Sequence, residues 1–206
     1  MARRGRAGRP RRAVSTEAIR KDILVFVEGM KTEETYVVFW HRICRARVNV
    51  RIDRRRGAPR QLVDWAAEAK AQDAREARRG QGRPVDEVWC CFDVDQHPKL
   101  DEVRVKAEAN GIHLAISNPC LELWFVLHFE DRTANISITA AQAHSEKLLG
   151  CRKALSDDAL AQLEARHPDA RSRAQALDHK HEGDGSPRGH NPSSAAWRLV
   201  DTIRDA

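Results

Sequence analysis

The stretch VWCCFDVDQH, residues 88–97, is an apolar run that ends in two acidic residues, Asp93 and Asp95. Side chains two positions apart on an extended strand point to the same face, so these two carboxylates repel each other. A wholly apolar run of this length is typical of a strand that is covered on both faces. The stretch therefore predicts a buried strand whose carboxyl end carries two acids, separated either by solvent or by a cation between them.

Three other segments predict strands of the same sheet: ILVFV (23–27), VNVRI (48–52) and IHLAIS (112–117). Helical patterns separate them, at about 32–43, 60–79 and 98–109. A further apolar helix is expected in NPCLELWFVLHFED, with Asn118 as its cap and Pro119 in its first turn. Strands that alternate with helices predict an α/β fold with an open, mainly parallel sheet flanked by helices. From residue 139 the pattern is helical, which adds a mostly helical C-terminal third.

The charge of the chain is concentrated at its N-terminus. The formal net charge is +6, from 36 basic and 30 acidic residues, and the first 12 residues contain six arginines and no acid. Removing those arginines leaves 30 basic against 30 acidic residues. We expect residues 1–20 to be a disordered tail, which either binds a polyanion or only aids solubility. Residues 21–206 are predicted to form one domain, with a core at about 21–130 and a helical extension at about 131–206.

Several features exclude other classes of protein. No apolar run approaches the ~20 residues that span a bilayer, so we expect no membrane partner. The five cysteines are odd in number and show no CxxC spacing, which argues against a disulfide framework or a zinc site. We therefore expect a cytoplasmic protein with reduced thiols.

Polar side chains stand where the predicted strands end. Glu28 follows the first strand, Asp93 and Asp95 follow another, and Ser117 and Asn118 follow a third. In an open α/β sheet the carboxyl ends of the strands lie along one edge, where ligands bind. Carboxylates that converge there raise one another's pKa, and a hard divalent cation such as Mg²⁺ relieves the repulsion. Each acid alone has a simpler explanation, because acids also favour the start of the next helix.

Two sets of motifs resemble known families. VEGMKTE (27–33) followed by FDVDQH (92–97) resembles the TOPRIM signature, in which a Glu and an Asp-x-Asp pair hold Mg²⁺. ISNPCLELWFVLHFE (116–130), followed by HNPSS (190–194), resembles the RloB family, and the order of all these motifs matches that family over nearly the whole chain after the tail. The resemblance implies a TOPRIM-like fold and a metal-dependent nuclease. It also implies a prokaryotic defence or restriction locus that encodes an AAA- or ABC-type ATPase partner.

The resemblance assigns roles to particular residues. It implies that Glu28, Asp93 and Asp95 bind Mg²⁺ or Mn²⁺, and that Glu122 belongs to the motif and to the catalytic set. Lys31 is added as a contact to phosphate, although primase-like relatives tend to have an acid near this position. Three further motif residues have no assigned role: Ser117, Asn118 and His128.

Helical geometry adds two expectations about this motif. Glu122 lies one helical turn beyond Asn118, so both are expected at one rim. His128 lies about 120° around the helix from Glu122, which favours a position in the core. Asn191 and Ser193 are expected to cap the last helix.

A basic loop is expected to neutralise phosphate charge on a bound strand. Its arginines are Arg54, Arg55, Arg56 and Arg60.

The leading hypothesis is therefore an Mg²⁺-dependent nuclease that hydrolyses phosphodiester bonds in DNA or RNA, as the effector of an anti-phage defence system. The alternative is a non-catalytic subunit that binds a metal-nucleotide or RNA and regulates an ATPase-containing complex, and a primase-like activity ranks last. In the alternative, the apolar segment LELWFVLHF (121–129) either packs in the core or forms a partner interface. A homodimer stays open.

Overall fold

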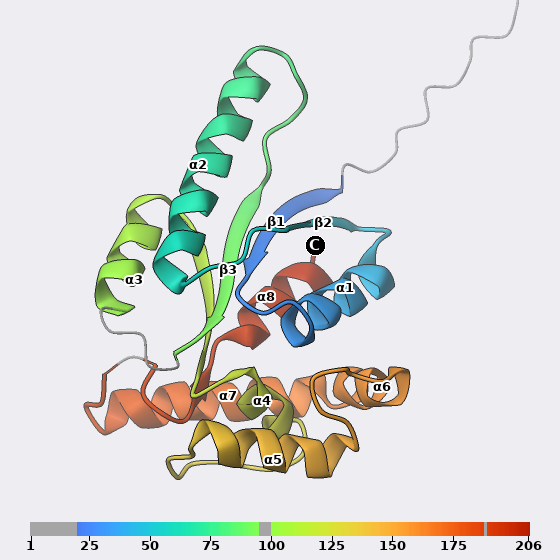
Figure 1. The fold of residues 1–206 in the computed structure, drawn as a ribbon, viewed down its shortest axis with the longest axis vertical. Helices are drawn as coiled ribbons and strands as arrows, with labels where there is room; N and C mark the ends of the chain where they lie inside the picture. The colour runs from blue at the N-terminus through green and yellow to red at the C-terminus, as the bar shows by residue number, and fades with distance from the viewer. Residues whose placement is uncertain (1–19, 95–99, 188) are drawn as a thin grey trace, which may run out of the picture.

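A single sheet forms the centre of the computed structural model, which describes residues 20–94, 100–187 and 189–206 (Figure 1). Within these residues the strand order is β2-β1-β3-β4-β5, with the first four strands parallel and β5 antiparallel to β4. The strands are β1 Lys21–Val27, β2 Val48–Asp53, β3 Glu87–Asp93, β4 His113–Asn118 and β5 Ser193–Ser194. The predicted open, mainly parallel sheet is confirmed.

Helices connect the parallel strands and then make up the rest of the described chain. Those between strands are α1 Thr32–Cys44, α2 Pro59–Arg78 and α3 Leu100–Ala109. Those that follow β4 are α4 Leu121–Leu127, α5 Ile138–Leu149, α6 Asp157–Ala165, α7 His167–Gly183 and α8 Ala196–Arg204. The predicted helical C-terminal part is confirmed, and α4 to α7 gather below the carboxyl ends of the strands (Figure 1).

The sheet is buried on both faces because successive residues of its strands face opposite cores. Ile23, Val25 and Val27 of β1 belong to the core under α1 and α8, which extends into α4–α7. Phe26 belongs to the second core, under α2 and α3. This double coverage explains why the strands appear in the sequence as continuous apolar runs rather than alternating ones.

Helix α4 begins later than the sequence pattern predicts. Asn118 does not cap it, because this residue ends β4, pairs with Ser193 and donates from Nδ2 to the Gly189 carbonyl at 2.8 Å. Cys120 occupies the position before the helix instead. Every residue of α4 except Glu122 is buried, so LELWFVL packs in the core and offers no partner interface.

The caps expected for the last helix are also wrong. The Asn191 side chain bridges to the backbone of Ile136, accepting from its N–H at 3.0 Å and donating to its carbonyl at 2.8 Å. Ser193 is part of β5. These residues therefore fix the HNPSS loop against the segment before α5.

The five cysteines are all free thiols, and four of them are buried. No helix among the described residues is long and apolar enough to cross a membrane.

Two histidines of the helical part are buried, and one of them, His167, contacts α1. His167 lies against the rings of Trp40 and Trp124, with centroid distances of 5.3 and 5.9 Å, and Arg204 donates to its Nδ1 at 2.7 Å. His128 Nδ1 bonds to the Trp124 carbonyl at 2.8 Å. Burial lowers the pKa of His128 to about 3 and, with help from Arg204, that of His167 to about 4. Both side chains are therefore neutral in the folded protein.

This burial predicts acid instability. Between the folded pKa values and the ordinary value near 6.5, the unfolded chain binds protons that the folded chain does not, so stability falls as the pH drops through this range. We expect His128→Leu to lose less thermal stability between about pH 7 and pH 4.5 than the wild type. The measurement is Tm against pH by circular dichroism, with the exposed His179→Leu as the matched control. A drop in Tm for His128→Leu equal to that of the control would contradict the assignment.

Candidate functional site

Two acids meet where β1 and β3 end. Glu28 directly follows β1, and Asp93 is the last residue of β3, which pairs with β1 in parallel. The Glu28 N–H donates to the Cys91 carbonyl at 3.1 Å, and the Asp93 N–H donates to Glu28 Oε2 at 3.3 Å. The sheet therefore holds these carboxylates side by side at its carboxyl edge. Asp95, the other acid of the predicted metal site, lies outside the described residues.

Two more acids reach the same place from helix starts. Glu33 stands in the first turn of α1, and Glu122 in the first turn of α4. Gly29 makes room for Glu33, because a Cβ at this position would overlap the Glu33 carboxylate. The glycine beside the motif acid Glu28 therefore allows a second carboxylate to fold back onto the strand end.

Three of these acids line one cavity of about 380 Å³, which we call the carboxylate hollow. It is lined by Gly29, Met30, Lys31, Thr32, Glu33, Asp93, Leu121, Glu122, Gln142 and Lys153. An adjoining cavity of about 260 Å³, between α5 and the loop after it, shares Glu122, Gln142 and Lys153 with it. The two cavities together offer space beyond the carboxylates themselves.

The electrostatics of the carboxylate hollow are strongly unbalanced. Burial raises the pKa of Asp93 to about 8, and the neighbouring charges of Glu33, Glu122 and Glu28 add to the effect. The pKa of Glu33 is raised by burial and by the charges of Glu122 and Glu28. Burial and like charge therefore both disfavour the ionised form of Asp93, which is typical of a functional site.

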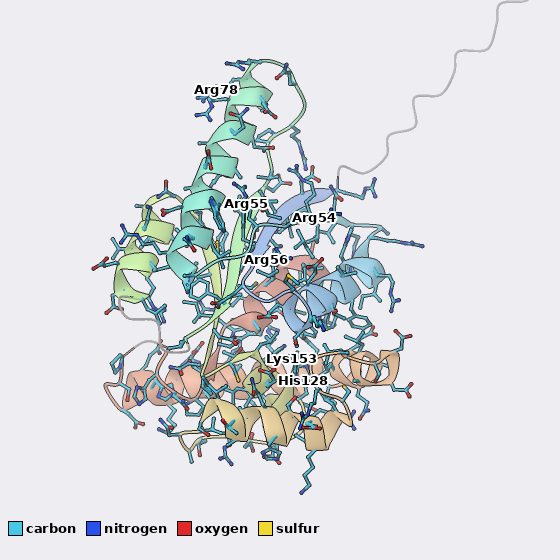
Figure 2. The ribbon with its side chains drawn as sticks, in the orientation of Figure 1. Arg54, Arg55, Arg56, Arg78, His128 and Lys153 are labelled. Atoms are coloured by element: carbon cyan, nitrogen blue, oxygen red, sulfur yellow. The ribbon has the colours of Figure 1, made fainter. Side chains whose placement is uncertain are left out.

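Two lysines stand at the wall of the carboxylate hollow. Neither the Lys31 nor the Lys153 ammonium has a hydrogen bond or ion pair with any residue that the structure describes. The Thr32 hydroxyl donates to the Lys153 carbonyl at 3.2 Å and so holds the loop after α5 against the start of α1. Figure 2 shows Lys153 in this region between the sheet and α5. The hollow thus combines several carboxylates with two exposed amines.

The ligand types in the hollow fit a hard divalent cation, although no complete metal centre is formed by the described residues. Within residues 20–94, 100–187 and 189–206, no group of three or more Asp, Glu, His or Cys side chains is arranged to hold a metal ion. Carboxylate oxygens are the ligands that Mg²⁺ prefers, and a cation would favour the ionised form of Asp93, which burial and the neighbouring carboxylates disfavour. Glu28, Asp93, Glu33 and Glu122 are therefore the described residues that fit such an ion.

The motif residues without assigned roles serve packing instead. Ser117 is buried and shares a hydrogen bond with Ser194, with the two Oγ atoms 2.8 Å apart. Asn118 bonds to Gly189 and does not line the carboxylate hollow, so the expectation that it shares a rim with Glu122 is wrong. His128 lies in the core, as its helical position predicts.

The arginines of the predicted nucleic-acid loop are largely engaged within the protein. Arg56 donates to Glu34 at 2.5 Å, Arg55 forms two hydrogen bonds to Asp53, and Arg60 lies 3.7 Å from Glu102. The Arg54 side chain is exposed and has no partner in the described part of the chain. Figure 2 shows Arg54, Arg55 and Arg56 together on this loop. The internal pairing leaves Arg54 as the loop residue best placed to meet a phosphate.

Two residues of the site were missed by sequence reasoning. Glu33 was not singled out as a site residue, although the Gly29 that accommodates it is visible in VEGMKTE. Lys153 stands in a loop without a recognisable motif, so no signal in the sequence places it at the site.

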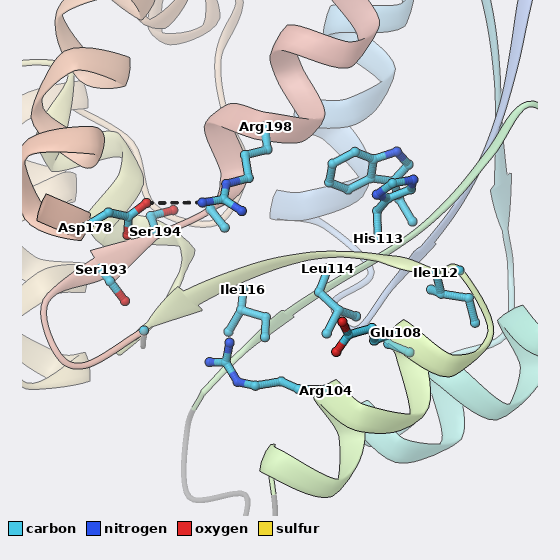
Figure 3. A pocket seen from close by; sticks show the side chains of 15 residues that line it. Arg104, Glu108, Ile112, His113, Leu114, Ile116, Asp178, Ser193, Ser194 and Arg198 are labelled. Carbon is cyan, nitrogen blue, oxygen red and sulfur yellow. Dashed lines mark hydrogen bonds and ion pairs between the residues drawn. The ribbon is translucent and has the colours of Figure 1, made fainter. Parts of the chain in front are cut away.

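A second cavity, of about 400 Å³, lies on the other side of β4, between α3 and α8 (Figure 3). Among its lining residues, Arg198 pairs with Asp178 at 3.5 Å. This cavity is slightly larger than the carboxylate hollow, but the converging carboxylates line the carboxylate hollow. We therefore place the candidate site in the carboxylate hollow.

Comparison with known proteins identifies the family. A family model described as RloB-like protein matches residues 23–203. The chain therefore belongs to the RloB-like family, as its motifs indicate. Searches of curated proteins and of solved structures found no match.

The charge imbalance predicts a measurable response to metal. In the metal-free protein the contribution of Asp93 to stability should fall as the pH rises from about 4 to about 8, opposite in sign to that of the buried histidines, because the unfolded state releases a proton that Asp93 retains when folded. We expect Asp93→Asn to raise the Tm of the metal-free protein at pH 8. Mg²⁺ or Mn²⁺ at ~100 times its Kd should stabilise the wild type by about 2.7 kcal/mol, or roughly 5–10 °C.

The readout is differential scanning fluorimetry with and without metal, and the control is Asp158→Asn, an exposed acid at the start of α6. Asp93→Asn should respond to metal much less than this control. An equal metal-induced shift in both variants would remove Asp93 from the metal site.

Proposed function

We propose that this member of the RloB-like family is a metal-dependent nuclease that hydrolyses phosphodiester bonds in nucleic acid. The single observation that supports this most is the convergence of Glu28, Glu33, Asp93 and Glu122 at the carboxyl edge of the sheet, where burial and the neighbouring carboxylates raise the pKa of Asp93 to about 8. A fold gains nothing in stability from such an arrangement. It suits a site that binds a cation together with a phosphate.

The carboxylates of the site would have two roles, metal binding and proton transfer. Glu28, Asp93 and Glu122 would hold one or two Mg²⁺ or Mn²⁺ ions, with Asp95 contributing from the segment after β3. When bound, the metal would polarise the phosphate and lower the pKa of the attacking water. Glu33, which lines the same hollow as Asp93, would accept a proton from the attacking water.

Lys31 and Lys153 would bind the substrate phosphate. Their ammonium groups line the carboxylate hollow and have no partner among the described residues. A nucleic-acid phosphate between them would be neutralised on the side away from the carboxylates. The adjoining cavity of about 260 Å³ gives room for the nucleotide next to the scissile bond.

The biological setting follows from the family alone. Resemblance to defence-associated RloB proteins supports an anti-phage effector that works with an AAA- or ABC-type ATPase, on DNA or RNA. Because LELWFVL is buried, the ATPase would have to dock on another surface.

A second candidate is a non-catalytic subunit that binds a metal-nucleotide or RNA. One observation favours it: no group of acids in the described ranges is closed tightly enough to hold a metal by itself. Binding of metal and nucleic acid without cleavage, under all conditions that include the ATPase partner, would select this alternative.

The nuclease proposal predicts that the carboxylates are essential. We expect Glu28→Gln, and the double change Asp93→Ala with Asp95→Ala, to reduce Mg²⁺-dependent cleavage by at least about 100-fold, because each removes ligands for the ion. The measurement uses labelled DNA and RNA with Mg²⁺ or Mn²⁺. Asp158→Asn should cut at the wild-type rate, and unchanged cleavage by the double variant would refute the proposal.

Lys153 provides a separate test, since no sequence motif marks it. We expect Lys153→Gln to lower kcat by about 10²- to 10³-fold if the ammonium stabilises charge that develops on the phosphate. Lys153→Arg should recover part of the rate. Lys147→Gln, an exposed lysine on α5, is the matched control. A change in stability without a change in kcat would assign Lys153 to folding alone.

A further inference from the structure

Helix α2 extends well beyond the sheet that anchors it. Its buried residues, Pro59, Leu62, Val63 and Ala66, all lie in its first two turns. The outer part of the helix and the turn after it project from the body, with Arg78 at the tip (Figures 1 and 2). We call residues 69–83 the basic arm. Burial of apolar surface does not explain why this helix is so long.

Backbone hydrogen bonds close the turn at the tip of the basic arm. After α2 the backbone turns through hydrogen bonds from Gly80 N–H to the Ala77 carbonyl at 2.9 Å and from Gln81 N–H to the Glu76 carbonyl at 3.0 Å. Gly80 and Gly82 adopt positive φ values of 77° and 100°, which glycine allows at little cost. Asp73 then accepts from the Val85 N–H at 2.6 Å and ties the returning chain to the helix. These hydrogen bonds hold the backbone from which the arginine side chains of the arm project.

The charges on the basic arm are unbalanced. Arg75, Arg78 and Arg79 are exposed, and Arg75 bonds only to the neutral Gln72 among the residues that the structure describes. Neither Arg78 nor Arg79 has a side-chain partner within the described ranges. These guanidinium groups therefore remain available for an external anion.

A second basic feature adjoins the base of the arm. A hollow of about 460 Å³ is lined by Arg20, Lys21, Arg47 and Arg83, and Asp86 is the one acidic side chain among its described lining residues. Arg83 donates to the Arg20 carbonyl at 2.7 Å and to Asp86 at 2.8 Å, which joins the arm to the start of β1. The arm and this hollow share Arg83 and together form what we call the basic surface, at the amino edge of the sheet. The arginine-rich sequence of residues 1–12 precedes the same edge.

We propose that this basic surface binds the phosphate backbone of nucleic acid at a distance from the carboxylate hollow. Exposed arginines without acidic partners bind phosphates through charge, without regard to sequence. Helix α2 has 20 residues, or about 30 Å of length, and it runs from the carboxyl edge of the sheet to the amino edge. A nucleic acid that contacts both edges must therefore span about nine base pairs. The choice of ligand rests on the proposed function, whereas the surface itself does not.

The test compares long and short ligands. Binding of hairpins with stems of about 20 and about 5 base pairs, in DNA and in RNA, is measured by fluorescence anisotropy over a range of salt concentrations in metal-free buffer, where no cleavage occurs. We expect Arg78→Ala with Arg79→Ala to weaken binding of the long stem and to reduce its salt slope by about 2. The short stem cannot contact both edges of the sheet at once, so it should bind the wild type more weakly than the long stem. If the arm variant loses affinity for only DNA or only RNA, that result would identify which nucleic acid the basic surface binds.

The matched control is Lys147→Ala with Lys180→Ala, which removes the same charge from exposed positions on α5 and α7. Long-stem binding by the arm variant equal to that of this control would overturn the proposal. A second outcome would favour an acidic protein partner instead. In that outcome, polyglutamate of matched charge binds the wild type as tightly as the long stem does, and its binding to the arm variant is weakened by the same factor. Failure of wild-type protein to cleave with Mg²⁺ would refute the nuclease proposal but would leave this binding comparison intact.

Discussion

Repulsion among buried carboxylates at the carboxyl edge of the sheet is the constraint on which the site depends. The parallel order of β1 and β3 brings Glu28 and Asp93 together, and the starts of α1 and α4 add Glu33 and Glu122. Apolar packing on both faces of the sheet holds these elements in place against the repulsion. The clustered carboxylates therefore lower stability at this edge of the sheet. Local arrangements that are unfavourable for folding are common at functional sites.

Helix α4 is the element that joins the sheet to the helical part. A helix that is apolar on all sides must be surrounded by protein, and α4 contacts β4, β5, α5 and α7. Its one polar residue, Glu122, stands in its first turn and lines the carboxylate hollow. The same packing that closes the core therefore also aims a carboxylate at the site.

The strands and the pair Glu28 and Asp93 were predictable from sequence, because apolar runs followed by acids leave few other interpretations. Glu33 was not, since an acid in the first turn of a helix is also expected from the helix dipole. The start of α4 was misplaced because Asn118 and Pro119 suit a helix start, whereas pairing with Ser193, 75 positions later, keeps Asn118 in the sheet.

Tertiary pairing explains the other limits of sequence reasoning. The arginines of residues 54–60 appeared available in sequence, but their partners include Glu34 and Glu102, which stand far away in the chain. Lys153 reaches the site through one hydrogen bond from Thr32, across 121 positions. Contacts of this kind depend on packing that local patterns do not encode.

The bond between Thr32 and the Lys153 carbonyl also has a consequence for biosynthesis. A ribosome-bound chain that has completed β1 to β4 already carries Glu28, Glu33 and Asp93, but it has not yet made Lys153. The acids are therefore made before the second amine, and the complete set of charges exists only after synthesis has passed α5. Cleavage of the backbone before Lys153 would leave the acids and this amine on separate pieces of the chain.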